Sequence, residues 1–329
     1  MKSFLKKGIQ AVAATAMIGA IAAPLAVNAQ GNYPDRPIKM IVAYSPGGAT
    51  DIVARLIGAE MEKLLGQPIV IDNKPGGGSN IGTAEAARAK PDGYTLLLAT
   101  IAQAINPAVY SKLTYDTRKD FEPVALTMTS PSVLVVNPNF PAKTAGELVA
   151  WAKANPGKLS MASSGAGGSP HMAAELLKLR AGIDYLHVPY KGANPAMNDV
   201  LSGVVMGGFK TATAAIPQIK AGKVRALAVA APQRLSQLPD LPTMAEAGFP
   251  DFNVASWNGV VAPAGTPKAI VDKLNAVINE VLKNPAVVAQ FEKRAAVPVG
   301  GSPAYFRAFI DRELKTWAKV AKAANVKIN

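Results

Sequence analysis

The sequence has no cysteine and only two histidines among its 329 residues. The absence of cysteine excludes disulfide bonds, thiolate nucleophiles and thiolate metal ligands. The two histidines, His171 and His187, have no acidic cluster near them in the sequence, which argues against a metal site. We therefore expect the protein to need neither a metal nor another cofactor.

Dense runs of one charge are also missing. The chain has 35 lysine and arginine residues against 22 aspartate and glutamate residues, a formal net charge of +13. The basic residues are scattered and are not interleaved with aromatic residues, which argues against nucleic acid as a partner. This distribution fits a diffuse positive field that attracts small anions. The alternative interpretation is that the charge serves solubility alone.

The one long apolar run lies at the N-terminus, where three lysines precede it and the small-residue pattern Val-Asn-Ala ends it. This pattern predicts a secretory signal peptide over residues 1–29, cleaved after Ala29. A retained membrane anchor is the alternative, and Gly19 and Pro24 inside the run argue against it. We therefore expect an exported chain, and no later stretch is long and apolar enough to span a bilayer.

After residue 30, strand-like segments alternate with amphipathic, helix-like segments. The pattern predicts strands at residues 38–44, 68–73 and 93–100, with helices at residues 51–66 and 81–89 between them. Such alternation is typical of an α/β fold with mostly parallel sheets and helices on both faces. A second series of the same kind begins at residue 132, which predicts a second α/β unit.

Three helices finish the sequence with hardly any strand among them, so they cannot form a third domain alone. We expect them to return to the first unit. Residues 30–128 and 254–329 would then form lobe 1, and residues 129–253 lobe 2. The chain would cross between the lobes near residues 127–132 and 253–257. Two such strands make a hinge, with a cleft between the lobes.

Three glycine-rich loops follow predicted strands and precede predicted helices. They are "YSPGGATD" (residues 44–51), "NKPGGGSN" (residues 73–80) and "SSGAGGSPH" (residues 163–171). In open parallel sheets, ligands bind beyond the carboxyl ends of the strands. Glycine lets the backbone approach a ligand, and a helix N-terminus offers free N–H groups and a partial positive charge. The loops therefore predict a site for an oxyanion.

A small carboxylate fits these loops better than a phosphate does. No lysine stands where a Walker A loop needs one, and neither of the first two loops has the full dinucleotide pattern. Asp51 would also lie unfavourably beside a pyrophosphate. For any single loop, a tight turn without a ligand remains the alternative.

The sequence shows no catalytic constellation. "SSGAG" lacks the glycine that a nucleophile elbow needs before its serine. His171 lies in the first turn of a predicted helix, where it would be a ligand contact or a capping residue, and His187 is expected to pack within a strand. A secreted hydrolase with Ser163 or Ser164 as nucleophile is one alternative to a binding protein. A sensor domain that presents a bound acid to a partner is another.

Nearly the whole exported chain resembles the Bug/TctC extracytoplasmic solute-binding receptors of tripartite tricarboxylate transporters. The segments that carry the resemblance occur in the family's order and include "YPDRPIKMIVAYSPGGATDIVARL", "GQPIVIDNKPGGGSNIGTAEAA", "PDGYTLLLAT", "MASSGAGGSPHMAAELL", "HVPYKG", "LPDLPTMAEAGFP" and "APAGTP". The resemblance implies a periplasmic protein with the two-lobed flytrap fold. It also implies a receptor without enzymatic activity that binds a small carboxylate and delivers it to the permease subunits of a membrane transporter. The carboxylate would be a di- or tricarboxylate or an aromatic acid, and we expect a monomer.

The resemblance also implies which residues contact the ligand. The carboxylate would lie between the loops at residues 44–51 and 163–171, beside the end of the strand that precedes Thr100 and Gln103. The expected contacts are Tyr44, Ser45, Gly47, Gly48, Thr50, Asp51, Thr100, Gln103, Ser163, Ser164, Gly165, Ser169 and His171, together with Lys210.

Lys210 marks a departure from the family, because many members have aspartate after the phenylalanine that corresponds to Phe209. If Lys210 faces the cleft, it repels an ammonium group and attracts a second carboxylate. This hypothesis predicts a dicarboxylate ligand, aliphatic or aromatic, without an amino group. In the alternative, Lys210 points to solvent or pairs with a nearby acid.

Overall fold

The computed structural model describes residues 33–328 of the chain. The predicted signal peptide and its cleavage after Ala29 lie outside the described residues. Residues from Pro34 onward pack as one unit. Within the described part, no helix has the length and apolar character needed to cross a membrane.

The first hundred described residues fold in the predicted strand–helix order. The elements are β1 (Ile38–Val42), α1 (Ala49–Leu65), β2 (Ile69–Asn73), the short 3-10 helix η1 (Gly77–Ser79), α2 (Asn80–Ala87), β3 (Thr95–Thr100) and α3 (Ala102–Val109). β1 pairs in parallel with both β2 and β3. Helix α1 buries Val53, Ile57 and Met61, which repeat at helical spacing, and it ends at Gly66 in the left-handed conformation.

The second series contains β4 (Phe121–Val136), α4 (Ala145–Ala154), β5 (Ser160–Ser163), α5 (Ser169–Ala181), β6 (Leu186–Pro189), α6 (Ala193–Leu201), β7 (Gly207–Thr211), α7 (Ala212–Lys220) and β8 (Arg225–Ala230). β5 pairs in parallel with β6 and β7, whereas β4 is antiparallel to β7 and β8. These strands form the second sheet, and β1, β2, β3 and the C-terminal strands form the first.

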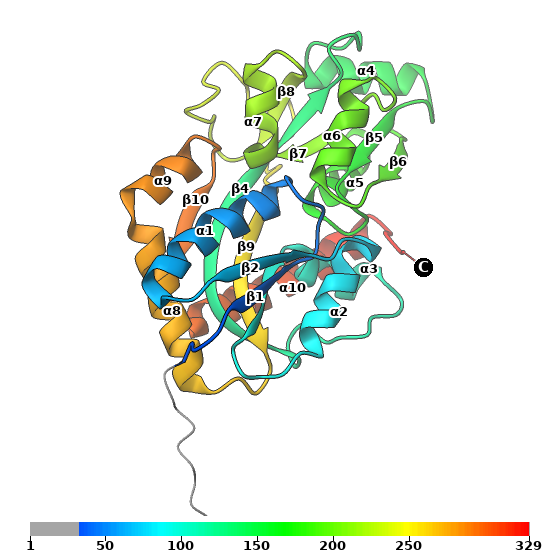
Figure 1. The fold of residues 1–329 in the computed structure, drawn as a ribbon. Coiled ribbons are helices and arrows are strands. Elements are labelled where there is room, and N and C mark those ends of the chain that lie inside the picture. The colour runs from blue at the N-terminus through cyan, green and yellow to red at the C-terminus, as the bar shows by residue number, and fades with distance from the viewer. Residues whose placement is uncertain (1–32, 329) are drawn as a thin grey trace, which may run out of the picture. The chain divides into compact units, whose positions relative to one another are not determined.

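The C-terminal segment returns to the first sheet, as predicted. It consists of β9 (Ala255–Pro263), α8 (Lys268–Lys283), α9 (Pro285–Glu292), β10 (Val297–Gly300) and α10 (Pro303–Ala323). β9 lies between β3 and β4, and α8 and α10 lie beside the first sheet (Figure 1). The short strand β10, antiparallel to β4, is an element that the sequence pattern did not indicate.

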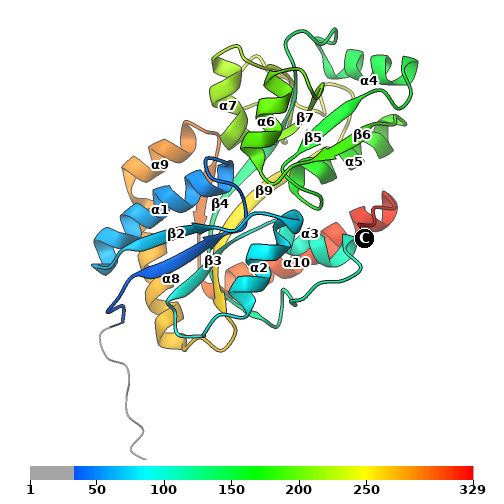
Figure 2. The same ribbon diagram turned by 45° about the vertical axis from the view of Figure 1, so that its right-hand side comes forward.

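The two sheets are continuous through β4, because this 16-residue strand belongs to both. Its first part pairs with β9 up to Pro131, and its last part, from Ser132, pairs with β7 and β8. Figure 2 shows β4 and β9 running from one group of elements to the other. Both strands are antiparallel to their neighbours, so parallel pairs occur only in the outer parts of the sheets. The prediction of mostly parallel sheets is therefore wrong: the sheets are mixed, because the strands that connect the two series run against the others. The lobe boundaries at residues 128 and 254 stay a prediction.

Candidate functional site

Two cavities lie beyond the ends of strands from both sheets, and their walls share Tyr44 and Ser164. The small cavity has a volume of about 30 Å³ and is lined by Tyr44, Gly48, Ala49, Thr50, Thr100, Ile101, Met128, Ser164, Gly168, Ser169, Pro170, Ala193, Thr211, Ser256 and Asn258. The large cavity has a volume of about 320 Å³ and is lined by Ala43, Tyr44, Gly76, Gly77, Gly78, Ser79, Tyr110, Ser164, Gly165, Ala166, Pro189, Tyr190, Lys191 and Ile328.

The N-terminal ends of five helices meet at the small cavity. Its walls include the first or capping residues of α1 and α3 from the first sheet, and of α5, α6 and α7 from the second. The first N–H groups of a helix have no partner within the helix, and its N-terminal end carries about half a positive charge. Seven lining residues also carry hydroxyl groups, and none of the described lining residues is acidic. This arrangement favours an anion.

Several residues predicted as ligand contacts are brought together here from distant parts of the chain. Tyr44, Gly48, Thr50, Thr100, Ser164 and Ser169 line the small cavity, and Tyr44, Ser164 and Gly165 line the large one. The two glycine loops that begin at residues 44 and 163 therefore face the same space. Direct contact of these residues with a ligand stays a prediction.

Asp51 does not line either cavity. Its side chain is only 3% exposed, and it accepts hydrogen bonds from the Gly47 N–H at 2.8 Å, from Arg55 Nε at 2.9 Å and from Asn73 Nδ2 at 3.0 Å. Burial alone would raise the pKa of Asp51, but these hydrogen bonds outweigh it and lower the pKa. Asp51 is therefore an ionised support for the loop, with its oxygens already engaged.

Ser45 and Gly47 lie at the contact between the first glycine loop and the segment before α6. The Ser45 N–H donates to the Lys191 carbonyl at 3.2 Å, and Asn194 Nδ2 donates to the Pro46 carbonyl at 3.2 Å. Neither Ser45 nor Gly47 lines a cavity. The hydrogen bonds of Ser45 and Pro46 join loops from the two sheets, whereas the Gly47 N–H donates to Asp51 within its own loop.

Gln103 is buried in α3, away from both cavities. Its side-chain amide forms no hydrogen bond with any described residue, although its backbone carbonyl accepts one from Thr117. The prediction placed Gln103 at the cleft because it closely follows Thr100. The intervening turn into α3 directs the chain inward after Thr100, so only Thr100 and Ile101 of this segment reach the cavity.

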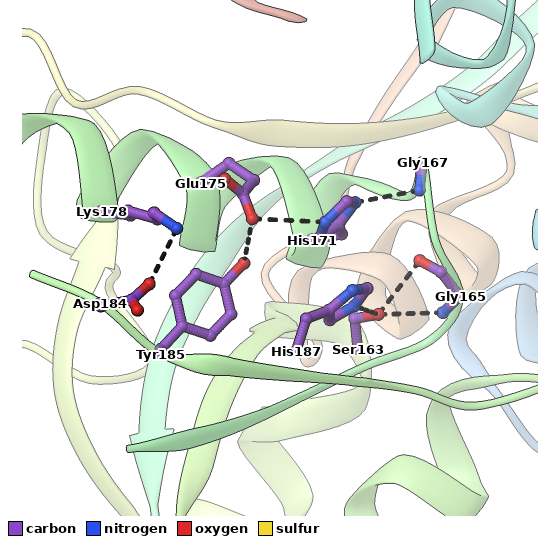
Figure 3. Close-up of polar contacts among 9 residues, drawn as sticks. All are labelled: Ser163, Gly165, Gly167, His171, Glu175, Lys178, Asp184, Tyr185 and His187. Carbon is purple, nitrogen blue, oxygen red and sulfur yellow. Dashed lines mark hydrogen bonds and ion pairs between the residues drawn. The ribbon is translucent and has the colours of Figure 1, made fainter. Parts of the chain in front are cut away.

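Ser163 and His171 are the two end residues of the glycine loop at residues 163–171 (the second glycine loop). They line neither cavity and belong to the network drawn in Figure 3. Ser163 Oγ lies 2.7 Å from His187 Nε2, and the Gly167 N–H donates to His171 Nδ1 at 3.1 Å. The two imidazole rings are stacked, with centroids 3.9 Å apart and planes 9° apart. Ser163 is 1% exposed and lines neither cavity, so a ligand held there would not reach its hydroxyl.

Lys210 is buried in β7 and lines neither cavity. Its Nζ donates to the carbonyls of Ala162 and Ala196, at 3.2 and 3.3 Å. Loss of solvation lowers the pKa of Lys210 to about 7. Neither sequence-based interpretation describes this position, because the side chain faces backbone carbonyls of β5 and α6 and not the cleft, the solvent or an acid. Lys210 therefore gives no support to a dicarboxylate ligand.

Outside the segments singled out in the sequence for ligand contact, four polar or helix-terminal residues line the small cavity, namely Ala193, Thr211, Ser256 and Asn258. Ser256 and Asn258 alternate along β9, which is the signal of a strand with one polar face. That face could have been assigned only with the knowledge that β9 inserts between β3 and β4. Ala193 follows Gly192 at the start of α6, in the segment "YKGANPA".

Comparison with known proteins identifies relatives along almost the whole chain. Protein BugT of Bordetella pertussis is 39% identical over 310 residues, which is 94% of each chain. The structure of the periplasmic binding protein BugD is 37% identical, with a TM-score of 0.87 over 90% of this chain and 99% of that one. The structure of R. palustris Rpa4515 with adipate is 36% identical, with a TM-score of 0.88 over 90% of this chain and 99% of that one.

These solved structures have the two-lobed α/β fold of periplasmic binding proteins, which confirms the predicted fold class. The family described as the tripartite tricarboxylate transporter family receptor (TctC) matches residues 53–326. This match covers most of the chain, and together with the similarity to BugT and BugD it establishes that the chain belongs to the TctC family.

Proposed function

We propose that this chain is a periplasmic solute-binding receptor for a small dicarboxylate without an amino group, which it delivers to the membrane subunits of a tripartite transporter. The observation that carries the proposal is the convergence of five helix N-termini on a cavity with no acidic side chain among its described lining residues. A carboxylate held there would receive hydrogen bonds from backbone N–H and hydroxyl groups without a fixed cation.

The absence of acids also argues against an amino-acid ligand. An ammonium group buried without a carboxylate partner is strongly unfavourable. Among the described residues that line the two cavities, Lys191 is the one charged residue, and it is a cation. The relative Rpa4515 was solved with adipate, a dicarboxylate without an amino group. Both observations support the same ligand class.

Binding, and not catalysis, is the role that the site supports. Ser163 and His187 are in hydrogen-bond contact, as a nucleophile and its base would be, but Ser163 is buried away from both cavities. Ser164 lines both cavities, and no described histidine lines either of them. We infer that the ligand leaves the protein chemically unchanged.

A binding panel tests the proposal. The protein is unfolded and refolded to remove any bound acid, then titrated calorimetrically with succinate, malate, adipate, citrate, phthalate, aspartate and glutamate. We expect one of the dicarboxylates without an amino group to bind and to raise the unfolding temperature. The stabilisation should reach about 2.7 kcal/mol at a hundred times the dissociation constant. Binding of amino acids alone would contradict the proposed ligand class, and binding of no acid would contradict the proposal as a whole.

Two substitutions locate the binding event. Thr50→Ala and Ser164→Ala each remove a hydroxyl from the cavity walls, one from each sheet's loop. We expect each to weaken binding by about tenfold, the effect of losing one hydrogen bond to a charged group. Ser236→Ala removes an exposed hydroxyl remote from both cavities and is the matched control. Unchanged affinity in both cavity variants would show that the acid binds elsewhere.

A further inference from the structure

The second glycine loop lines both cavities, but the side chains that hold it lie on its far side. Ser164 borders both cavities, Gly165 and Ala166 border the large one, and Gly168 borders the small one. His171 and His187 line neither cavity, although their rings contact the same loop at two points. Figure 3 shows the two imidazoles side by side, each reaching a different end of the loop.

The contact between Gly167 and His171 determines where the proton of His171 lies. Because the Gly167 N–H donates to Nδ1 at 3.1 Å, that nitrogen carries a lone pair and the proton is on Nε2. Nε2 faces a carboxylate oxygen of Glu175, 3.5 Å away on the next turn of α5. The same oxygen accepts a hydrogen bond from the Tyr185 hydroxyl at 2.7 Å. The Glu175 carboxylate thus favours this tautomer of His171.

The contacts of Ser163 determine the proton position on His187. Ser163 Oγ lies 3.1 Å from the Gly165 carbonyl, 3.3 Å from the Gly165 N–H and 2.7 Å from His187 Nε2. A hydroxyl has one proton to donate. All three contacts are satisfied when Ser163 donates to the Gly165 carbonyl and accepts from the other two groups. The proton of His187 then lies on Nε2, so His187 does not act as a base toward Ser163.

Both rings must be uncharged for this arrangement to persist. Two imidazolium ions stacked 3.9 Å apart would repel each other, and a protonated Nδ1 on His171 could not accept from Gly167. Burial is the main cause that lowers the pKa of His187 to about 3. The other groups near the pair are Glu175, which is hydrogen-bonded to Tyr185, and the exposed pair of Lys178 with Asp184.

From these contacts we infer that His171 and His187 are positioning residues, a neutral stacked pair that holds the Ser163–Gly168 loop in its ligand-binding shape. The inference rests on the proposed function, since the loop is the second sheet's part of the proposed carboxylate site. In His171 the nitrogen that contacts the loop is Nδ1, and in His187 it is Nε2. Aromatic stacking keeps the two rings in register with each other.

Asparagine and glutamine substitutions can distinguish the roles of these two nitrogens. The amide of asparagine occupies roughly the place of Nδ1 of a histidine, and the longer glutamine places its amide near Nε2. His171→Asn should therefore still accept from Gly167, while His171→Gln should not. At the other ring the order reverses, because His187→Gln can donate to Ser163 and His187→Asn cannot reach it.

The experiment measures the affinity of the four variants for adipate, or for whichever acid of the panel the wild-type protein binds. We expect His171→Asn and His187→Gln to bind within about threefold of the wild type, and His171→Gln and His187→Asn to bind about tenfold more weakly or worse. Lys178→Ala, on the same helix and exposed, should leave affinity unchanged. Denaturant unfolding of every variant separates lost loop geometry from lost folding.

A measurement on the wild-type protein without ligand completes the test. Nitrogen-15 NMR of the two imidazoles should show both rings neutral at pH 7 with the proton on Nε2. A charged ring, or a proton on Nδ1 of His171, would overturn the inference. So would equal affinities for the asparagine and glutamine variants at each position. If the wild type binds no carboxylate at all, the proposed function fails first, and the role in ligand binding fails with it.

Discussion

Two of the three glycine loops that line the cavities have the same local geometry, although they belong to different sheets. They are the loops at residues 44–51 (the first loop) and 163–171 (the second loop). In each, a glycine with positive φ (+74° at Gly47, +80° at Gly167) precedes a second, extended glycine that caps the following helix. In each, the first glycine donates its N–H to a side chain four residues later, Asp51 or His171. That side chain contacts another one four residues further along the helix.

The loops differ in the charge of their supports. In the first loop the acceptor is the ionised Asp51, which is paired with the exposed Arg55 and with Asn73 at the end of β2. In the second loop the acceptor is an imidazole, and a second imidazole from the neighbouring strand β6 is stacked on it. In both loops the polar side chain therefore holds the loop backbone, although one support is an anion and the other a neutral ring.

Replacing Gly47 or Gly167 by alanine should have the largest effect on ligand affinity, and the effect should differ between the two loops. A Cβ on Gly167 would overlap Asn106 Oδ1, and Asn106 is fully buried and fixed by its hydrogen bonds to Gly78 and Asn80. We expect Gly167→Ala to lower the affinity for the ligand by about a hundredfold, since left-handed strain adds to the overlap. Calorimetric titration measures this loss.

The same change in the first loop should be milder. A Cβ on Gly47 would overlap the amide of Asn194, which is exposed and can rotate away at the cost of its hydrogen bond to the Pro46 carbonyl. We expect Gly47→Ala to weaken binding by about tenfold, mainly through backbone strain. Gly157→Ala is the matched control, because Gly157 also has positive φ but has open space around it. Equal affinities of the Gly47 and Gly167 variants would contradict the difference between the loops.

The next largest effect is expected from the replacement of Asp51, the acid that supports the first loop. Asp51→Ala leaves the Gly47 N–H without its acceptor and removes one of the two acceptors of Asn73 Nδ2, whose bond to the Tyr44 carbonyl remains. We therefore expect the free energy of unfolding to fall by about 2 kcal/mol. Because the folded pKa of Asp51 lies below its unfolded value, its stabilisation is present above pH 4 and is lost as the pH falls through the folded value. Asp51→Asn should therefore make acid unfolding less steep.

Chemical unfolding between pH 2 and pH 7 checks this prediction for Asp51. Glu62→Gln is the control, because Glu62 is an exposed acid on the same helix. If wild type and Asp51→Asn respond to acid with the same slope, Asp51 does not carry a lowered pKa in the folded protein.

The sequence was sufficient for the fold class because both sheets are built from long alternations of strand and helix. It was not sufficient for β10, a four-residue strand whose residues show no buried alternation, or for the sharing of β4 between sheets. The second of these depends on β9 inserting beside β3, which is a contact between residues more than 150 positions apart.

For the site, the sequence located the loops but not the direction of each side chain. Thr50 and Asp51 are neighbours in the first turn of α1, where successive side chains point about 100° apart. Thr50 lines the small cavity and Asp51 turns back to the loop. The prediction for Lys210 was wrong for a related reason. The carbonyls that accept its hydrogen bonds belong to β5 and α6, and no local sequence pattern indicates that these elements pack against β7.

A smaller effect is expected from Lys210, a buried lysine of the second sheet. Its folded pKa of about 7 lies below the unfolded value of 10.5, so the unfolded state binds more protons between these two pH values. The free energy of unfolding therefore rises with pH across this range. Between pH 7.5 and 8.5 the free energy of unfolding should rise by about 1 kcal/mol from this residue. Lys210→Met should abolish this rise, and Lys220→Met, on α7, serves as the control. A slope that persists in Lys210→Met would mean that the lysine stays charged.

The smallest effect is expected from the exposed partner in the first loop. The Arg55 side chain is 55% exposed, so its ion pair with Asp51 is screened by solvent, and Asp51 keeps its bonds to Gly47 and Asn73 without it. Arg55→Ala should lower the free energy of unfolding by less than about 1 kcal/mol, and less still in 0.5 M salt.

The counterpart of Arg55 in the second loop is Glu175, which is mostly buried and whose carboxylate joins His171 to Tyr185. Glu175→Gln should therefore alter stability and ligand affinity more than Arg55→Ala does, and the reverse order would show that the first loop depends on its ion pair and not on the buried carboxylate.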